Sequence, residues 1–153
     1  MNSLELKIPP PVVALLLALL MWLTSRGVPA LEVPFALRVG AALALVCIGQ
    51  GITISGMVAF RRAKTTINPI KAHAASSLVT QGVYRFTRNP MYVGLMLTLL
   101  GWAAFLSGPL ALIWLVVYVL YINRFQIVPE ERVLTSLFGA EYVKYKNEVR
   151  RWL

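Results

Sequence analysis

Four apolar runs divide this chain, and their lengths constrain its fold more than any other feature. The runs are Ile8–Leu23, Phe35–Phe60, Met91–Leu106 and Leu110–Ile122. Only the second reaches the roughly 20 apolar residues that cross a bilayer comfortably as a helix. For the three shorter runs, helix tilt, local thinning of the bilayer and a partly interfacial hairpin all stay open. The runs predict an all-α integral membrane protein with about four transmembrane helices, in a single domain over residues 1–153.

The last two apolar runs are separated only by Ser107-Gly108-Pro109, a turn signal without charge. We therefore expect these two runs to form a tight helical hairpin whose tip needs no contact with water. The more polar residues 61–90 are expected to be a loop, and residues 123–153 a C-terminal helical tail.

The composition agrees with lipid as the main solvent of this chain. Apolar residues make up 58% of the 153 residues, against about 45 to 50% in soluble domains. The 15 Lys and Arg outnumber the 6 acids, all of them Glu, which gives a formal net charge of +9. Basic segments facing water suit anionic lipid headgroups, whereas the apolar fraction argues against nucleic acid as a partner. The single Cys47 lies within an apolar run, where helix packing is its expected role.

The positions of the basic residues predict the orientation in the membrane. The loop 61–90 and the tail 123–153 are both rich in Lys and Arg, and the loop contains no acid. Both segments therefore belong in the cytoplasm by the positive-inside rule. Four crossings then return both termini to the cytoplasmic side. A competing interpretation is a signal peptide cleaved after "GVPA", but its first residues pair Glu5 with Lys7 and carry little net positive charge.

Small residues recur at helical spacing in the second and third runs. The first stripe is Gly40, Ala44, Cys47, Gly51 and Ser55, and the second is Gly94, Thr98, Gly101 and Gly108. Such stripes let helix backbones approach closely in lipid. The sequence "CIGQGITISG" also contains G-x-G, but no strand is expected before it, so packing is the better interpretation than dinucleotide binding.

The sequence "YRFTRNPMYVG" places charge at the mouth of the third run. Asn89 and Pro90 favour a turn followed by a helix, with Asn89 as its cap and Pro90 at its first position. A helix N-terminus flanked by Arg85 and Arg88 suits an anion such as a carboxylate or phosphate. The alternative is a membrane-entry helix with snorkelling arginines and an interfacial Tyr92.

The tail "VPEERVLTSLFGAEYVKYKNEVRRWL" predicts two short helices. Pro129 begins the first, in which Glu130 shares a face with apolar residues and therefore needs a partner, while Glu131 lies about 100° away and reaches solvent. Gly139 ends it. The second helix has an aromatic face made of Tyr142, Tyr145, Val149 and Trp152. The alternative is that the acids only favour the helix dipole and that the aromatic, basic helix lies on a membrane surface.

Three stretches carry a resemblance to a known family. They are "TTINP", "SSLVTQGVYRFTRNPMYVG" and "PEERVLTSLFGAEYVKYKNEVRRWL". Their order, G-x-Y-x-x-x-R-[HN]-P-x-Y-x-G, a hydrophobic hairpin, then E-E-x-x-L and F-G-x-x-Y-x-x-Y, resembles the bacterial branch of the isoprenylcysteine carboxyl methyltransferase and phospholipid methyltransferase superfamily. The resemblance implies a small membrane enzyme of the bacterial inner membrane that uses S-adenosylmethionine at its cytoplasmic rim.

The resemblance also implies roles for individual residues. The catalytic residues would be Arg88, Glu130 and Glu131. Residues implied in cofactor binding are Tyr84, Arg85, Asn89, Pro90, Tyr92, Gly94, Glu130, Tyr142 and Tyr145. This chain departs from the eukaryotic carboxyl methyltransferases in two places. Asn89 replaces a His, and Glu148 occupies the position of an Arg, for which Arg150 is a candidate replacement.

The cofactor that the resemblance implies fits these residue types chemically. Its carboxylate suits Arg88, its ammonium and ribose hydroxyls suit a carboxylate such as Glu130, and its sulfonium suits aromatic faces. The acceptor of the methyl group would be lipid-like, with a carboxylate, an amine or a thiol as the nucleophile. Only an amine needs a base to remove a proton.

Two other functions stay open from the sequence. Sterol reductases share a similar R-[HN]-P-x-Y-x-G element, so an NADPH-dependent membrane reductase is the alternative enzyme. A small packing or transport protein without catalysis is the second alternative, although the runs lack the acid within the bilayer that a coupled transporter usually has. The lone His73, in a loop, offers no metal site. Oligomeric state stays open, because the stripes of small residues could pack helices within one chain or between two.

Overall fold

The computed structural model describes residues 5–63 and 77–153. All regular structure in these residues is helical. The elements are α1 (Pro10–Ser25), α2 (Phe35–Arg62), the short helix η2 (Gly82–Arg85), α3 (Pro90–Leu106), α4 (Ala111–Ile122), the π-type turn η3 (Asn123–Ile127) and α5 (Val128–Glu148). The all-helical prediction is therefore confirmed for the described residues. The "TTINP" stretch, Lys71 and His73 lie outside them.

The four expected apolar runs coincide with α1 to α4, and local breakers set their ends. Pro10 and Pro90 occupy the first positions of α1 and α3, where a missing backbone N–H costs nothing and φ is already helical. Ser107 ends α3 in the left-handed conformation, with φ of 49°. The tight hairpin between α3 and α4 is thus confirmed.

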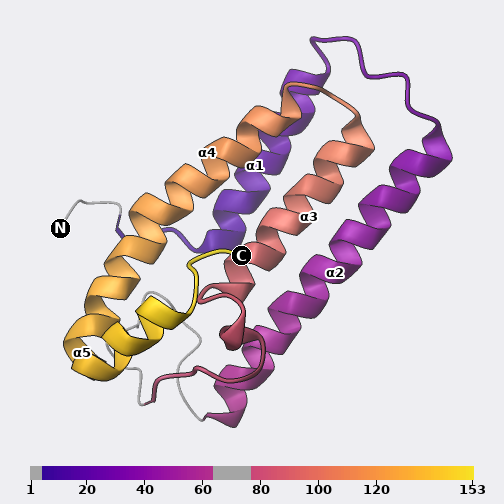
Figure 1. The fold of residues 1–153 in the computed structure, drawn as a ribbon. Helices are drawn as coiled ribbons and strands as arrows, with labels where there is room; N and C mark the ends of the chain where they lie inside the picture. Colours follow the sequence, from indigo (N-terminus) through magenta and orange to yellow (C-terminus); the bar gives the residue numbers. More distant parts are fainter. Residues whose placement is uncertain (1–4, 64–76) are drawn as a thin grey trace.

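The helices form an elongated bundle in which successive helices run in opposite directions (Figure 1). Helix α3 is central and packs against α1, α2 and α4, and its contact with α2 is the most extensive in the molecule. The main core lies between α1, α3 and α4 and includes the fully buried Met21, Tyr118 and Ile122. A smaller cluster around Tyr84, Tyr142 and Tyr145 lies where η2 meets α5.

The contact between α2 and α3 uses glycines on both helices. A Cβ on Gly94 would collide with the carbonyl oxygen of Gly49 and the Oγ1 of Thr53, and a Cβ on Gly49 would lie 2.6 Å from the Gly94 carbonyl oxygen. Gln50 donates a hydrogen bond to Thr98 Oγ1 over 3.0 Å. Gly94, Thr98 and Gly101 of the predicted stripe therefore face α2, whereas Gly108 lies beyond α3 and meets Ser25 of α1.

The stripe predicted on α2 does not pack within this chain. Its members Gly40, Ala44, Cys47, Gly51 and Ser55 are all exposed. Two glycines outside that stripe, Gly49 and Gly56, are the buried residues of α2. Small residues occur on more than one face of this helix, and the partner helix decides which face is used within the chain. Packing of the stripe and of Cys47 between two chains stays a prediction.

Helix α4 continues into α5 through η3 without a loop, so the tail begins as an extension of the fourth apolar helix. Within α5, Gly139 adopts φ of 51° and ψ of −124°, which kinks the helix. The predicted break at Gly139 is therefore confirmed. The kink turns the second part of α5 back beside η2, beneath the bundle in Figure 1.

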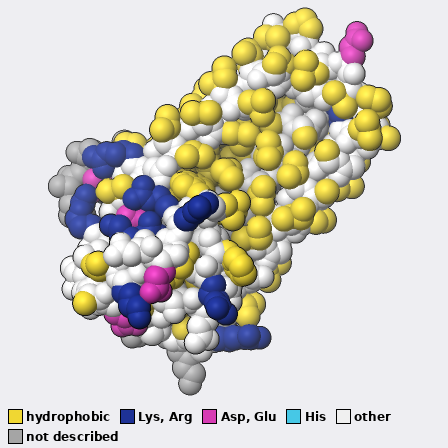
Figure 2. All heavy atoms as spheres, viewed as in Figure 1, with side chains coloured by type: hydrophobic (Ala, Val, Ile, Leu, Met, Phe, Trp, Pro, Cys, Tyr) yellow, Lys and Arg dark blue, Asp and Glu magenta, His cyan; other side chains and the backbone are white. Residues whose placement is uncertain are grey.

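The apolar surface and the charged surface are separate. In Figure 2 hydrophobic side chains cover the length of the bundle, and Lys and Arg gather at the end where α5 lies. Two helices among the described residues are long and apolar enough to cross a membrane, α2 and the continuous helix Ala111–Glu148, while α1 and α3 are shorter apolar helices. A membrane protein follows from this surface more readily than a soluble one.

Candidate active site

A pocket of about 310 Å³ opens at the basic end of the bundle. The beginning of α3 forms its floor, α1 and α2 its sides, and α5 its far wall. Its residues are Pro10, Pro11, Thr53, Met57, Phe60, Ser77, Leu78, Val79, Tyr84, Arg88, Asn89, Pro90, Met91, Tyr92, Leu95, Ile127, Glu130, Glu131, Leu134, Tyr142 and Tyr145. The two motifs that are distant in sequence, around Arg88 and around Glu130, therefore meet across one cavity.

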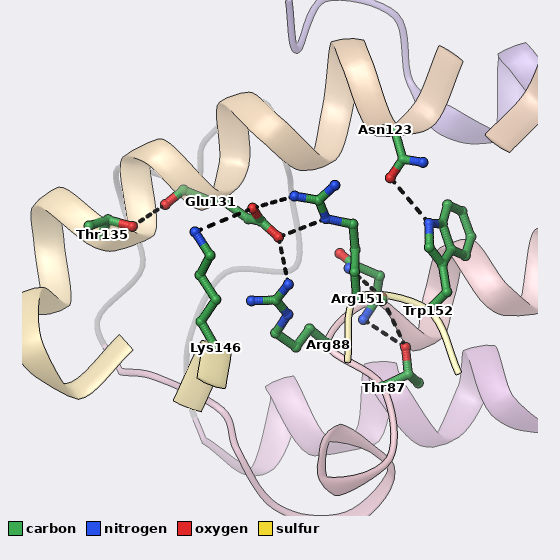
Figure 3. A network of polar contacts seen from close by, with 9 residues as sticks. Thr87, Arg88, Asn123, Glu131, Thr135, Lys146, Arg151 and Trp152 are labelled. Carbon is green, nitrogen blue, oxygen red and sulfur yellow. Dashed lines mark hydrogen bonds and ion pairs between the residues drawn. The ribbon is translucent and has the colours of Figure 1, made fainter. Parts of the chain in front are cut away.

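Glu131 is the centre of an ion-pair network at the pocket wall (Figure 3). Arg151 binds it with two nitrogens, Nε to Oε1 at 3.0 Å and Nη2 to Oε2 at 2.8 Å. Arg88 Nη2 lies 3.0 Å from Oε1, and Lys146 Nζ lies 3.9 Å from Oε2. Three cations thus surround one carboxylate that is 10% exposed.

The expectation that Glu131 reaches solvent was wrong. That expectation assumed a helix with solvent on the side away from its apolar residues. In the structure the C-terminal residues fold back along that side and bring Arg151 onto Glu131. Because the pairing spans 20 residues and a kink at Gly139, helical periodicity does not predict it.

Arg88 has unused hydrogen-bonding capacity inside the pocket. Its side chain is 9% exposed, and Nη2 is occupied by Glu131. Its Nε and Nη1 are buried and have no hydrogen-bond partner among the described residues. Buried N–H groups of a guanidinium are costly to leave unpaired. A carboxylate or phosphate placed in the pocket would satisfy them, and the planar guanidinium matches such a group geometrically.

Glu130 is partly buried in the pocket, and no cation pairs with it among the described residues. It accepts a hydrogen bond from the Tyr92 hydroxyl, 3.1 Å from its Oε2. Burial raises the pKa of Glu130, the Tyr92 hydrogen bond lowers it, and the negative charge of Glu131 raises it, so that the pKa lies at about 7. Glu130 thus exchanges a proton near neutral pH, and any cation bound beside it would favour its charged form.

A buried tyrosine on α4 fixes the position of Tyr92. The hydroxyl of Tyr118 donates to the backbone carbonyl of Tyr92 over 3.2 Å, and Tyr118 is fully buried. Sequence reasoning missed this residue, because a tyrosine inside an apolar run carries no local signal of its partner.

Three tyrosines form one part of the pocket wall. Tyr145 donates its hydroxyl to the Tyr84 carbonyl over 2.7 Å, and the rings of Tyr142 and Tyr145 lie 6.3 Å apart. Phe60 of α2 packs edge-on to Tyr84. Burial raises the pKa of all three tyrosines, so they present neutral rings, and the faces of such rings attract cations.

The turn before α3 is bound to the end of the chain. The backbone N–H of Arg88 donates to the Arg150 carbonyl at 3.0 Å, and Asn89 Nδ2 donates to the Arg151 carbonyl at 2.8 Å. Asn89 therefore does not cap α3 with its side chain, contrary to prediction. Trp152 also donates its indole N–H to Asn123 Oδ1 at 3.1 Å. These contacts place the guanidinium of Arg151, and not that of Arg150, on Glu131.

Two residues expected in the cofactor site lie elsewhere. Arg85 is exposed and does not line the pocket. Gly94 is buried in the contact between α2 and α3. The other expected residues, namely Tyr84, Arg88, Asn89, Pro90, Tyr92, Glu130, Glu131, Tyr142 and Tyr145, line the cavity together. Sequence reasoning missed the apolar walls from α1 and α2, because Pro10, Pro11, Met57 and Phe60 carry no chemical signal.

A metal centre is not indicated in the part of the chain that the structure describes, where no group of three or more His, Cys, Asp or Glu comes together. The site instead combines one free guanidinium edge, one uncompensated carboxylate and a set of aromatic rings.

Comparison with protein families identifies the origin of this arrangement. The family model described as phospholipid methyltransferase matches residues 37–141. The chain belongs to the phospholipid methyltransferase family. The matched residues contain α2, Arg88, Glu130 and Glu131, whereas Tyr142, Tyr145 and Arg151 follow the matched region.

Two eukaryotic methyltransferases are similar to this chain over most of its length. Protein-S-isoprenylcysteine O-methyltransferase of Schizosaccharomyces pombe is 32% identical over 117 residues, 75% of this chain and 49% of that protein. Protein-S-isoprenylcysteine O-methyltransferase B of Arabidopsis thaliana is 29% identical over 107 residues, 70% of this chain and 54% of that protein. The chain spans about half the length of these two methyltransferases.

A short bacterial protein is also similar to this chain. An uncharacterized protein of Haemophilus influenzae is 49% identical over 63 residues, which are 41% of this chain and 100% of that protein. No solved structure matches this chain.

Proposed function

We propose that this protein transfers a methyl group from S-adenosylmethionine to a lipid-like substrate that is dissolved in the membrane. The observation that carries the proposal is Arg88, which lines the pocket and whose buried Nε and Nη1 have no hydrogen-bond partner among the described residues. Membership of a methyltransferase family supports a methyl donor as the ligand. When bound, S-adenosylmethionine supplies an electrophilic methyl group on a sulfonium.

Different residues of the pocket bind the different charged groups of the cofactor. Arg88 holds the carboxylate through its free Nε and Nη1, beside the N-terminus of α3, whose dipole favours an anion. Glu130 accepts from the ammonium or the ribose hydroxyls. Rings from Tyr84, Tyr142 and Tyr145 attract the sulfonium. Catalysis is then mainly positioning of donor and acceptor and exclusion of water.

Glu131 has a positioning role in this proposal. Its carboxylate is occupied by Arg151, Arg88 and Lys146, so it fixes the direction of the Arg88 guanidinium and keeps Nε and Nη1 free. If the acceptor is an amine, Glu130 takes its proton when it contacts the ribose hydroxyls of the cofactor and not the ammonium, because an ammonium beside it would hold the charged form. A carboxylate or thiolate acceptor needs no base.

A second hollow supports an acceptor with a long apolar chain. It is a groove of about 540 Å³ between α1, α2 and α3, lined by Pro11, Ala14, Leu15, Ala18, Ala42, Val46, Leu95, Thr98, Leu99, Gly101, Trp102 and Phe105. Pro11 and Leu95 line both the groove and the polar pocket. An acceptor lying in the groove therefore presents its polar end to the pocket from within the bilayer.

The same proposal places the protein in the membrane. Helices α1 to α4 cross the bilayer, and the pocket with both chain ends lies at the basic, cytoplasmic face of a bacterial inner membrane. Exposed Lys and Arg around α5 contact anionic headgroups there. The short α1 and α3 cross by tilting or by thinning the bilayer locally.

Calorimetric titration of the detergent-purified protein tests the cofactor. S-adenosylmethionine should bind, and Arg88→Ala should weaken its affinity by about 100-fold, the loss of two charge-assisted hydrogen bonds. Arg85→Ala is the matched control, because this exposed neighbour does not line the pocket. If Arg88→Ala bound S-adenosylmethionine as tightly as the parent protein, Arg88 would not be a cofactor-binding residue.

Titration with NADPH separates the alternatives. Binding of NADPH in place of S-adenosylmethionine would point to a reductase, and binding of neither would point to a protein without this catalysis. Binding of S-adenosylmethionine alone would justify a search for the acceptor among membrane lipids, with release of S-adenosylhomocysteine as the assay.

A further inference from the structure

The segment before α1 folds back over the junction of α4 and α5. The backbone N–H of Leu6 donates to the Phe125 carbonyl at 3.0 Å, and Gln126 Nε2 donates to the Ile8 carbonyl at 2.7 Å. Gln126 is fully buried. Both contacts fall on η3, where the helix widens into a π-type turn. The segment before α1 is therefore joined to this turn by one backbone hydrogen bond and by one bond from a buried side chain.

Glu5 fastens this segment with its side chain. Its carboxylate is 3% exposed and lies between Arg124, with Nη1 at 3.0 Å, and Arg132, with Nη1 at 3.4 Å. The hydrogen bond from Arg124 lowers the pKa of Glu5, so the acid is charged at neutral pH. The two arginines are 48% and 57% exposed. A buried acid is thus ion-paired with two arginines whose side chains are partly exposed at the surface. We call Glu5 to Pro9, with these contacts, the clasp.

The clasp joins two walls of the pocket. On one side it leads through Pro9 directly into Pro10 and Pro11, which line the pocket from α1. Consecutive prolines have φ fixed by their rings, so a movement of the clasp is passed on to these two residues. On the other side Arg124 and Arg132 flank Ile127 and Glu130, which line the pocket from η3 and α5.

We propose that the clasp holds the start of α1 against η3 and so closes the side of the pocket between Pro11 and Glu130, and that it opens locally to admit the methyl acceptor. Glu5 is then a positioning residue that acts through Arg124 and Arg132. The identity of the entering molecule rests on the proposed function; the local opening itself does not.

The contacts of the clasp favour a segment that opens locally over one that stays closed in the folded protein. The clasp is held by a few polar contacts, two of them with half-exposed arginines, and by the partly buried Ile8 at the edge of the core, whereas the core between α1, α3 and α4 is apolar and continuous. Segments with few buried apolar contacts open at lower free energy than the core they cover. Breaking the clasp therefore frees the pocket side of α1 before it unfolds the bundle.

Thiol labelling measures this opening directly. Cys47→Ser removes the natural cysteine, and Ile127→Cys places a reporter at a fully buried pocket residue beside the clasp. Ala111→Cys, made separately, places a second reporter at a fully buried residue at the far end of α4. Glu5→Gln should raise the N-ethylmaleimide labelling rate at position 127 by about tenfold, the effect of losing a charge-assisted hydrogen bond, and leave the rate at 111 unchanged.

Controls separate the clasp from general destabilisation. Glu32→Gln, an exposed acid in the loop between α1 and α2, should change neither rate. Arg132→Gln removes the longer of the two contacts from an exposed position, and should raise the rate at 127 by a smaller factor. Equal rates at 127 in Glu5→Gln and the parent, or equal increases at 127 and 111, would overturn the clasp.

The result is independent of the cofactor assignment. If S-adenosylmethionine binds and labelling is unaffected by Glu5→Gln, the proposed function survives and the clasp fails. If labelling responds at position 127 alone and S-adenosylmethionine does not bind, the clasp gates a pocket with a different ligand. If both hold, Glu5→Gln should leave the affinity for S-adenosylmethionine within about twofold while the pocket side opens, because Glu5 does not itself line the pocket.

Discussion

The hydroxyl of Tyr92 on α3 donates a hydrogen bond to Oε2 of Glu130 on α5 over 3.1 Å. This single contact links the helix that begins at Pro90 to the acid motif of the tail, and it lowers a pKa that burial otherwise raises. The protonation of Glu130 is therefore set by a residue from another helix.

Tyr92→Phe should raise the pKa of Glu130 above about 7, because the phenylalanine keeps the ring and removes the hydrogen bond that favours the carboxylate. The measurement is proton release when S-adenosylmethionine binds, obtained by calorimetry in buffers of different ionisation enthalpy. With native Tyr92, binding of an ammonium beside Glu130 should release protons below pH about 7 and none from this group well above it. A Tyr92→Phe profile that coincides with the native profile would contradict the coupling.

Glu130→Gln should stabilise the folded protein in mildly alkaline solution. The pKa of Glu130 is raised from 4.5 to about 7 on folding, so the folded state binds the proton more tightly than the unfolded state does. Its contribution to stability is greatest below pH 4.5 and is lost as the pH rises through about 7. Thermal unfolding in detergent at pH 8 should therefore occur at higher temperature in Glu130→Gln, while at pH 4 the two proteins should coincide. If Glu130→Gln also lost binding of S-adenosylmethionine, Glu130 would be a residue that is needed for binding and lowers the stability of the folded protein.

Glu131→Gln should destabilise the protein strongly, by about 3 to 5 kcal/mol, because it removes the anion from three surrounding cations. Exposed Glu141 on the same helix provides the control, and Glu141→Gln should change the free energy of unfolding by no more than about 0.5 kcal/mol. Chemical denaturation in mixed micelles gives both values. Similar values for the two variants would mean that the network contributes nothing to folding.

Gly94→Ala should destabilise the α2–α3 contact by about 1 to 3 kcal/mol, the usual penalty for overpacking. The added methyl group meets Thr53 Oγ1 and the Gly49 carbonyl oxygen. Gly51→Ala is the matched variant on the exposed face of α2, where a Cβ has nothing within 4 Å. It should be neutral or stabilising by up to about 1 kcal/mol, from helix propensity alone. The reverse order of stability would place the helix contact on the other face of α2.

The helices were predictable from the sequence, whereas the pairing of their faces was not. Prolines and the Ser107-Gly108-Pro109 turn mark the helix ends locally, so the expected runs agree with α1 to α4. The face of α2 that packs on α3 depends on Gly94, in another helix, so the exposed stripe of small residues misled the prediction.

The gathering of Arg88 and Glu130 around one cavity was expected because two motifs shared a basic rim. The sequence did not predict that Glu131 is ion-paired while Glu130 has no cation. This difference depends on Arg151, which reaches Glu131 only after the chain turns at Gly139. Long-range charge pairs of this kind have no periodic signature within one helix.

The contacts of Arg88 also fix when the pocket can come into existence during biosynthesis. Its guanidinium pairs with Glu131, and its backbone N–H donates to the carbonyl of Arg150, which lies beyond the kink in α5. A ribosome makes Arg88 well before either partner, since synthesis proceeds from the N-terminus. Until those residues are made, the Arg88 guanidinium and backbone N–H lack both of these partners. The pocket end of the molecule is therefore completed only after the chain through Arg150 has been made, later than the helices α1 to α3 that carry it.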